Sequence, residues 1–117
     1  MRYRVRNLTR NTLLADQATV ADTFGSRFKG LLGVSEYPMG SGLHIVPCNS
    51  IHMFFMKIAL DVLFLDPELT VVDALEAFPP WRVSRIYPSA RSVLELPVGA
   101  LRGSQTQPGD RLVFEPT

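Results

Sequence analysis

Most of the chain is divided into short apolar runs, each about as long as one β-strand and each followed by residues typical of turns. Four of the segments that separate these runs contain turn-favouring Pro, Gly, Asn or Asp: Pro47 to Ser50, Asp66 to Leu69, Pro79-Pro80 and Gln107 to Asp110. The apolar runs are Leu13 to Val20, Leu43 to Val46, Ile51 to Met56, Leu60 to Asp66, Thr70 to Phe78, Ser92 to Leu96 and Arg111 to Glu115. This pattern predicts a mainly β (α+β) protein, built as a small curved sheet or barrel-like domain of short antiparallel strands.

One segment has apolar residues at helical spacing. Those that share a helix face are Phe24, Phe28, Leu31 and Leu32. Asp22 or Thr23 can cap the N-terminus of such a helix, and Gly33 can end it. We therefore expect one short helix near residues 23–32, packed against the sheet.

Length and composition favour one folded domain over residues 1–117. The chain has 117 residues, 46% hydrophobic and 20% charged, unlike disordered, collagen-like or coiled-coil chains. Its formal net charge of +1 lacks the basic excess of a dedicated nucleic-acid-binding protein, so nucleic acid is not the expected partner. No apolar segment is long enough for a membrane span or a secretory signal. We therefore expect a cytoplasmic protein.

Several groups of residues occur in an order that resembles a known family. They are Arg27 to Leu32, Met53 with Met56-Lys57 before Leu60 to Asp66, Val93 to Gly99, and Pro108 to Leu112. Together they resemble the domain of unknown function 192 family over about residues 18–114. The resemblance implies a small β-rich single domain with one helix, and it carries over no activity and no catalytic residues. The chain departs from the family pattern at His52 to Met56, where His-Met-Phe-Phe-Met stands in place of a Trp-Met pair.

His44, Cys48 and His52 are the candidate metal ligands, because imidazole and thiolate both bind zinc. Pro47 argues against a helix that would bring them together. In a β-hairpin, the length of the loop decides whether the two histidines share a face of the sheet. The alternative is two unrelated histidines and a buried small thiol. We expect no metal and no cofactor, and keep this set as the alternative.

Covalent catalysis would have to use the same residues. The single cysteine, Cys48, excludes a disulfide within the chain and would need His52 or His44 as a base, with Asp61 as a candidate third member. Asp61 begins an apolar run, so it can instead organise a loop by accepting hydrogen bonds. Glu95 lies between two leucines, which places it on the opposite face of its strand, where we expect it to be exposed or paired with an arginine.

The segment Phe78 to Arg91 has the features of a recognition surface. It contains Trp81, the chain's only tryptophan, together with Arg82, Arg85 and Arg91 and no acidic residue. Tryptophan and arginine are enriched among the residues that dominate binding energies. The alternative is a solvated loop in which Trp81 folds back into the core.

Met53 and Met56, with Phe54 and Phe55, form the most apolar cluster of the chain. Strand alternation puts these side chains on two faces, so at least one set belongs to the core. The other set can line the mouth of a small barrel as a soft pocket for an apolar ligand or a partner side chain.

The sequence thus predicts a non-enzymatic binding or accessory module that recognises a small anionic ligand or an acidic protein partner. The residues expected to bind are Trp81, Arg82, Arg85, Arg91, Met53 and Met56. The alternative is an enzyme or metal-binding protein that uses Cys48 with His52 or His44. The ligand and the oligomeric state are left open.

Overall fold

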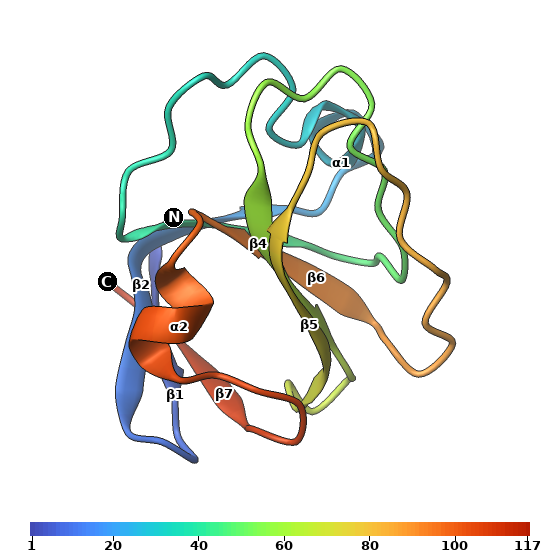
Figure 1. Cartoon of the computed structure of the whole chain (residues 1–117). Helices are drawn as coiled ribbons and strands as arrows, with labels where there is room; N and C mark the ends of the chain where they lie inside the picture. Colours follow the sequence, from blue (N-terminus) through green and yellow to red (C-terminus); the bar gives the residue numbers. More distant parts are fainter.

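The computed structural model describes all residues 1–117. The strands are β1 (Tyr3–Asn7), β2 (Thr12–Ala21), β3 (Ser41–Ile45), β4 (Leu60–Leu65), β5 (Val71–Phe78), β6 (Ser92–Leu96) and β7 (Leu112–Pro116), and the helices are α1 (Phe24–Lys29) and α2 (Ala100–Ser104). All seven strands belong to one sheet with the order β5-β4-β6-β3-β2-β1-β7 (Figure 1). The mainly β architecture expected from the sequence is therefore confirmed.

The sheet curls into a half-barrel (Figure 1). Its two outermost strands, β5 and β7, come together where they begin: Thr70 forms a bridge with Arg111, and the backbone N of Leu112 donates to the carbonyl of Leu69 at 2.9 Å. All paired strands are antiparallel except β2 and β3, which run parallel. The expected set of antiparallel strands thus has one parallel pair, because the chain between β2 and β3 crosses over through α1.

Apolar residues are buried on both faces of the sheet. One core, which includes Val5, Leu94 and Leu101, lies inside the half-barrel against α2. A second core, which includes Ile45, Met53 and Phe64, lies on the other face. All six residues of β4 and all five of β6 are consequently buried, which explains why these strands lack a regular alternation of polar and apolar residues.

The predicted helix exists but is shorter than expected. Thr23 caps α1 by accepting a hydrogen bond from the backbone N of Ser26, and the helix ends at Lys29 instead of Leu32. Gly30 follows with a φ of 47°, a conformation that ends a helix at little cost only for glycine. Leu31 still packs into the second core. The second helix, α2, was not predicted, because five residues that include Gly103 give almost no helical pattern.

The predicted strand at Ile51 to Met56 is instead a loop with a single bridge at His52 and one turn at Phe54-Phe55. Its first half pairs loosely with the segment after β5, through a single bridge between His52 and Val83. At Phe55 the backbone is left-handed, with a φ of 63°, which turns the chain back before a ladder can form. No helix of the structure has the length and apolar character needed to cross a membrane.

Candidate functional site

A pocket with a volume of about 170 Å³ opens between the C-terminal half of α1 and the sheet. Its apolar wall is formed by Leu31, Ile45, Ile51 and Met56. Its polar groups come from six side chains: Arg27, Lys29, Cys48, Ser50, His52 and Glu95. A cavity lined by apolar side chains with a few converging polar groups is the usual form of a small-molecule site.

Glu95 reaches this pocket from β6, between Leu43 of β3 and Val62 of β4. It is only 6% exposed, and its carboxyl group has neither a hydrogen bond nor an ion pair within the protein. Burial raises the pKa of Glu95 to about 7. The sequence-based expectation of an exposed or arginine-paired residue is therefore wrong. Glu95 does lie on the opposite face from its flanking leucines, but that face is also covered.

Arg27 and Lys29, which are two residues apart in α1, bring two positive charges to the pocket. Nη1 of Arg27 donates to the backbone carbonyl of Pro47 at 3.2 Å. Its Nε is buried and has no hydrogen-bond partner. Nη2 also makes no hydrogen bond but is not buried, so it is the part of the guanidinium that can donate to an acceptor from outside the chain.

Cys48 and His52, expected as a catalytic pair, both line this pocket, but no hydrogen bond joins them. Sγ of Cys48 donates to the backbone carbonyl of Ser50 at 3.0 Å. Burial raises the pKa of the Cys48 thiol, and the nearby Glu95 carboxylate acts in the same direction. A nucleophilic cysteine needs the opposite shift, so this geometry does not support covalent catalysis.

His44 lies away from the pocket, on the inner side of the sheet. Its ring stacks on Phe114 with the centroids 4.4 Å apart, and its Nε2 lies 2.8 Å from Oγ of Ser92. Burial lowers the pKa of His44 to about 4. The structure therefore does not bring His44 together with Cys48 and His52, and no three His, Cys, Asp or Glu side chains are grouped to hold a metal ion.

Asp61 is 1% exposed and lies at the start of β4. Its carboxylate accepts hydrogen bonds from three backbone N–H groups, those of Ala77, Gly99 and Leu101, at 2.8 to 3.1 Å. It thus fixes the end of β5 and the start of α2, the structural role that the sequence offered as the alternative to catalysis.

The two methionines expected at a binding surface are buried. Met53 is 1% exposed inside the second core, where an external ligand does not reach it. Met56 is 8% exposed and lines the pocket beside Arg27 and Glu95. Of the pair, only Met56 is positioned to touch a ligand.

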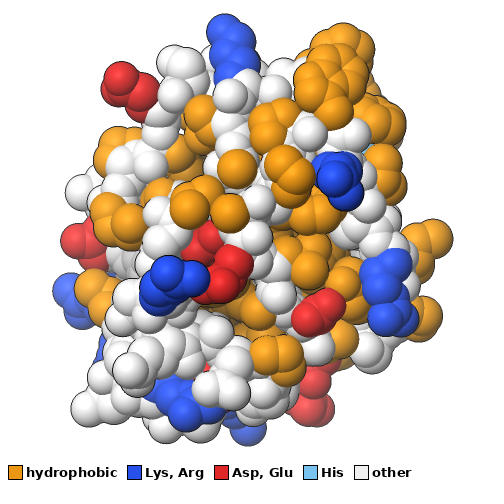
Figure 2. Space-filling view, in the orientation of Figure 1, with side chains coloured by type: hydrophobic (Ala, Val, Ile, Leu, Met, Phe, Trp, Pro, Cys, Tyr) orange, Lys and Arg blue, Asp and Glu red, His pale blue; other side chains and the backbone are white.

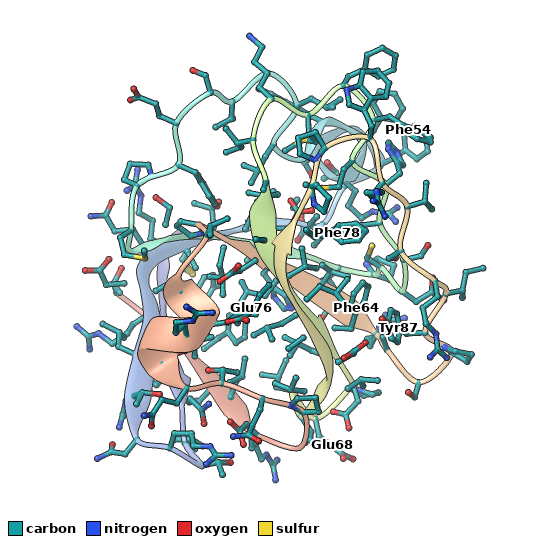
Figure 3. The ribbon with its side chains drawn as sticks, viewed as in Figure 1. Phe54, Phe64, Glu68, Glu76, Phe78 and Tyr87 are labelled. Carbon is teal, nitrogen blue, oxygen red and sulfur yellow. The ribbon has the colours of Figure 1, made fainter.

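Three aromatic residues on two neighbouring turns, Phe54, Phe55 and Trp81, form what we call the aromatic surface. The Trp81 ring lies 4.9 Å from that of Phe55 and 6.1 Å from that of Phe54. Trp81 is 58% exposed and Phe55 72% exposed, so Trp81 is not the core plug considered as the alternative. Figure 3 shows Phe54 projecting from the edge of the molecule. The His52 ring lies 5.1 Å from that of Phe54 and links the aromatic surface to the pocket.

The three arginines expected beside Trp81 do not form one cluster. Arg82 follows Trp81 directly, and its backbone carbonyl accepts a hydrogen bond from Met53 at 2.7 Å. The Arg85 guanidinium lies 4.8 Å from the centre of the Tyr87 ring, whose hydroxyl donates to Asp73. Arg91 lines a separate shallow groove with Pro47 and Cys48. Only Arg82 therefore adjoins the aromatic surface along the chain.

Three segments that surround the pocket and the aromatic surface carry positive charge alone. Residues 24–32, 51–58 and 79–91 contain six basic residues and no acidic one. Figure 2 shows hydrophobic and basic side chains, without acidic ones, in its upper right part. The local charge thus differs clearly from the formal net charge of +1 of the whole chain.

The curled seven-stranded sheet with two short helices defines a class of small β-proteins already seen in solved structures. A protein of unknown function from Novosphingobium aromaticivorans superposes with a TM-score of 0.81, at 19% identity, over 97% of this chain and 84% of its own. A protein from Sinorhizobium meliloti 1021, described as a candidate transcription regulator, superposes with a TM-score of 0.79, at 24% identity, over 97% of this chain and 92% of its own. These identities establish the fold alone.

The chain belongs to the DUF192 family, described as "Uncharacterized ACR, COG1430", whose model matches residues 5–114. Among its relatives are a UPF0127 protein of Thermococcus gammatolerans, 36% identical over 95% of this chain and 74% of the relative, and one of Thermococcus sibiricus, 34% identical over 93% and 73%. The family resemblance expected from the sequence is confirmed. Because the family is uncharacterised, a function has to be argued from the chain's own geometry.

Proposed function

We propose that this protein is a non-enzymatic binding module that recognises an acidic partner protein through the aromatic surface and Arg82. The observation that carries the proposal is that Phe55 and Trp81 remain largely exposed although they pack against each other. Large exposed aromatic groups of this kind typically belong to interaction sites, and tryptophan supplies more binding energy per residue than most side chains.

The backbone beneath these rings supports the same proposal. Phe55 and Trp81 both have left-handed backbones, with φ values of 63° and 69°. For a bulky residue this conformation costs about 1 to 2 kcal/mol. Two short hydrogen bonds, from Trp81 to Met53 and from Met53 to Arg82, each 2.7 Å, hold the turn in this shape. The fold thus accepts local strain at the positions that present the aromatic rings.

Charge indicates the chemistry of the partner. Lys57 and Arg82 flank the aromatic surface along the chain, and no acidic residue occurs in residues 51–58 or 79–91. An acidic partner would be attracted by these charges, with the attraction weakened by added salt. The raised pKa of Cys48 and the absence of a hydrogen bond between Cys48 and His52 favour binding over the enzymatic alternative. The cytoplasmic location expected from the sequence stays a prediction.

The proposal can be tested by selecting peptides from a random library displayed on phage against the immobilised protein. We expect selected peptides to combine acidic residues with aromatic or aliphatic ones, and synthetic copies to bind more weakly at higher salt. Trp81→Ala and Arg82→Glu should each weaken their binding by about tenfold or more. Arg4→Glu, which alters an exposed charge on β1, is the matched control and should leave binding unchanged.

The proposal would be contradicted if the selected peptides lacked acidic residues, or if they bound the Trp81→Ala variant as tightly as the unaltered protein. A single-stranded thymidine oligonucleotide provides a second comparison, because stacked aromatics beside arginine also suit unpaired bases. Tighter binding of this oligonucleotide than of any selected peptide, lost in Trp81→Ala, would replace the acidic protein partner with a nucleic acid.

A further inference from the structure

The pocket beneath α1 has a chemistry that the aromatic surface does not explain. It contains an acid and a cation with unused hydrogen-bonding capacity: the Glu95 carboxyl makes no hydrogen bond, and the Arg27 guanidinium uses only Nη1, in its bond to the carbonyl of Pro47. Buried polar groups in folded proteins are nearly always paired. Two unpaired groups of opposite chemistry that line one pocket indicate a ligand that pairs with both.

We propose that this pocket binds a small aliphatic amino acid as a zwitterion, its carboxylate on Arg27, its ammonium on Glu95, and its alkyl chain against Ile51 and Met56. A ligand with only an anionic group would leave Glu95 without a partner. A ligand with only a cationic group would be repelled by the positive charges of Arg27 and Lys29. A zwitterion satisfies both groups and adds no net charge to the pocket.

The size of the pocket agrees with such a ligand. Its volume is about 170 Å³, whereas a cavity of about 150 Å³ accommodates benzene. The side chain of leucine fits an apolar wall of this kind, since Leu31, Ile45, Ile51 and Met56 are each less than a tenth exposed. The two charged ends of the ligand would then lie toward α1 and β6.

The environment of Glu95 makes ligand binding depend on pH. The Glu95 carboxyl is close enough to Tyr37 and Cys48 to affect the pKa of both, and Arg27, Lys29 and His52 line the same pocket. Its neighbours on β3 and β4 are the apolar Leu43 and Val62. Without ligand, burial keeps the pKa of Glu95 at about 7. An ammonium group beside the carboxyl favours its ionised form, so binding should release a proton near neutral pH.

Three related probes separate the contributions of the two ends: leucine, 4-methylpentanoate, which lacks the ammonium, and 3-methylbutylamine, which lacks the carboxylate. Titration calorimetry should show that leucine binds about tenfold or more tightly than either truncated probe. In Glu95→Gln the affinity for leucine should fall to that for 4-methylpentanoate. In Arg27→Gln both acids should bind more weakly, whereas Arg102→Gln, at a residue 85% exposed, should change nothing.

The unaltered protein provides a second measurement, which does not depend on the folding of any variant. Leucine binding at pH 7, measured in phosphate and in Tris, should release about half a proton per site. In Glu95→Gln this release should disappear. Equal affinity for leucine and 4-methylpentanoate, no proton release, or no binding of leucine at all would overturn the proposal. These outcomes test the pocket independently of the proposed acidic partner. Trp81→Ala, which should weaken binding of that partner, should not alter leucine binding.

Discussion

Asp61 on β4 holds the beginning of α2 in place through the backbone of Leu101, whose N–H donates to Oδ2 of Asp61 at 3.0 Å. The same oxygen accepts from Gly99 at 3.1 Å, and Oδ1 accepts from Ala77 at 2.8 Å. Gly99, the residue that caps α2, offers no side chain for capping. A carboxylate from a strand distant in the sequence therefore supplies the cap of this five-residue helix.

We accordingly expect Asp61→Ala to destabilise the protein by about 3 kcal/mol or more, because each buried donor left without a partner costs about 1 to 3 kcal/mol. Urea denaturation followed by circular dichroism would measure the loss. Asp66→Ala is the matched control. Asp66 also accepts two backbone hydrogen bonds, from Glu68 and Thr70 at 2.9 Å, but it is only partly buried. Water can therefore take the place of its carboxylate, and we expect Asp66→Ala to lower the free energy of unfolding by about 1 kcal/mol. Equal losses would contradict this interpretation.

The contribution of Glu95 to the stability of the protein should decrease with rising pH. Burial raises its pKa from the ordinary 4.5 to about 7, so the unfolded chain gives up this proton at lower pH than the folded one. The stabilisation is complete below about pH 4.5 and is lost as the pH rises to 7, in total on the order of 3 kcal/mol.

Glu95→Gln removes the titrating group while keeping its shape. We expect the variant to match the unaltered protein at pH 4 and to be more stable than it at pH 8, in urea titrations at both values. The carbon-13 chemical shift of the Glu95 carboxyl, followed by NMR, gives the pKa directly. A midpoint near 4.5 would contradict the prediction.

Sequence patterns predicted the strands well because most of them depend on local signals. The run Ser92 to Leu96 was predicted with the bounds that β6 has, and the start of β4 at Leu60 was also correct. Proline and glycine turns separate these strands, and such turns are determined by the residues themselves. The helix α2 was missed because a residue far away in the sequence, Asp61, stabilises it.

The candidate site was predicted less well, for a physical reason. The strand pattern correctly placed Glu95 on the face opposite its flanking leucines. The pattern of one strand does not reveal that α1 and the segment around Cys48 cover that face. The exposure of Trp81 likewise depends on the left-handed turns at residues 55 and 81, which no glycine or asparagine in the sequence marks. A single glutamate within a run of buried residues is the signal that could have indicated the pocket.

His44 should contribute a pH dependence of stability of the opposite sign over nearly the same pH range as Glu95, so the two contributions offset each other in the unaltered protein. Burial lowers its pKa from 6.5 to about 4, so the unfolded chain binds this proton more readily. Stability from His44 is complete above about pH 6.5 and decreases as the pH falls to 4. His44→Gln can still reach Oγ of Ser92 and should flatten this decrease. If proton NMR shows that His44 titrates near pH 6.5, the prediction is wrong.

Cys48 should react slowly with iodoacetamide in the folded protein. Burial raises the pKa of its thiol more than the backbone hydrogen bond at Ser50 and the charge of Arg27 lower it, so little of the reactive thiolate is present at neutral pH. We expect alkylation at pH 7.5, followed by mass spectrometry, to be slower in the folded protein than in the same protein unfolded in urea.

Cys48→Ser separates the structural role of this residue from a chemical one. A serine hydroxyl can donate to the same carbonyl, so we expect a loss of stability of about 1 kcal/mol and unchanged binding of peptides at the aromatic surface. Folded Cys48 that reacted faster than the unfolded chain would have a lowered pKa. Because thiolate activation is what the catalytic hypothesis requires, that result would favour a nucleophilic cysteine in the pocket over the non-enzymatic function proposed above.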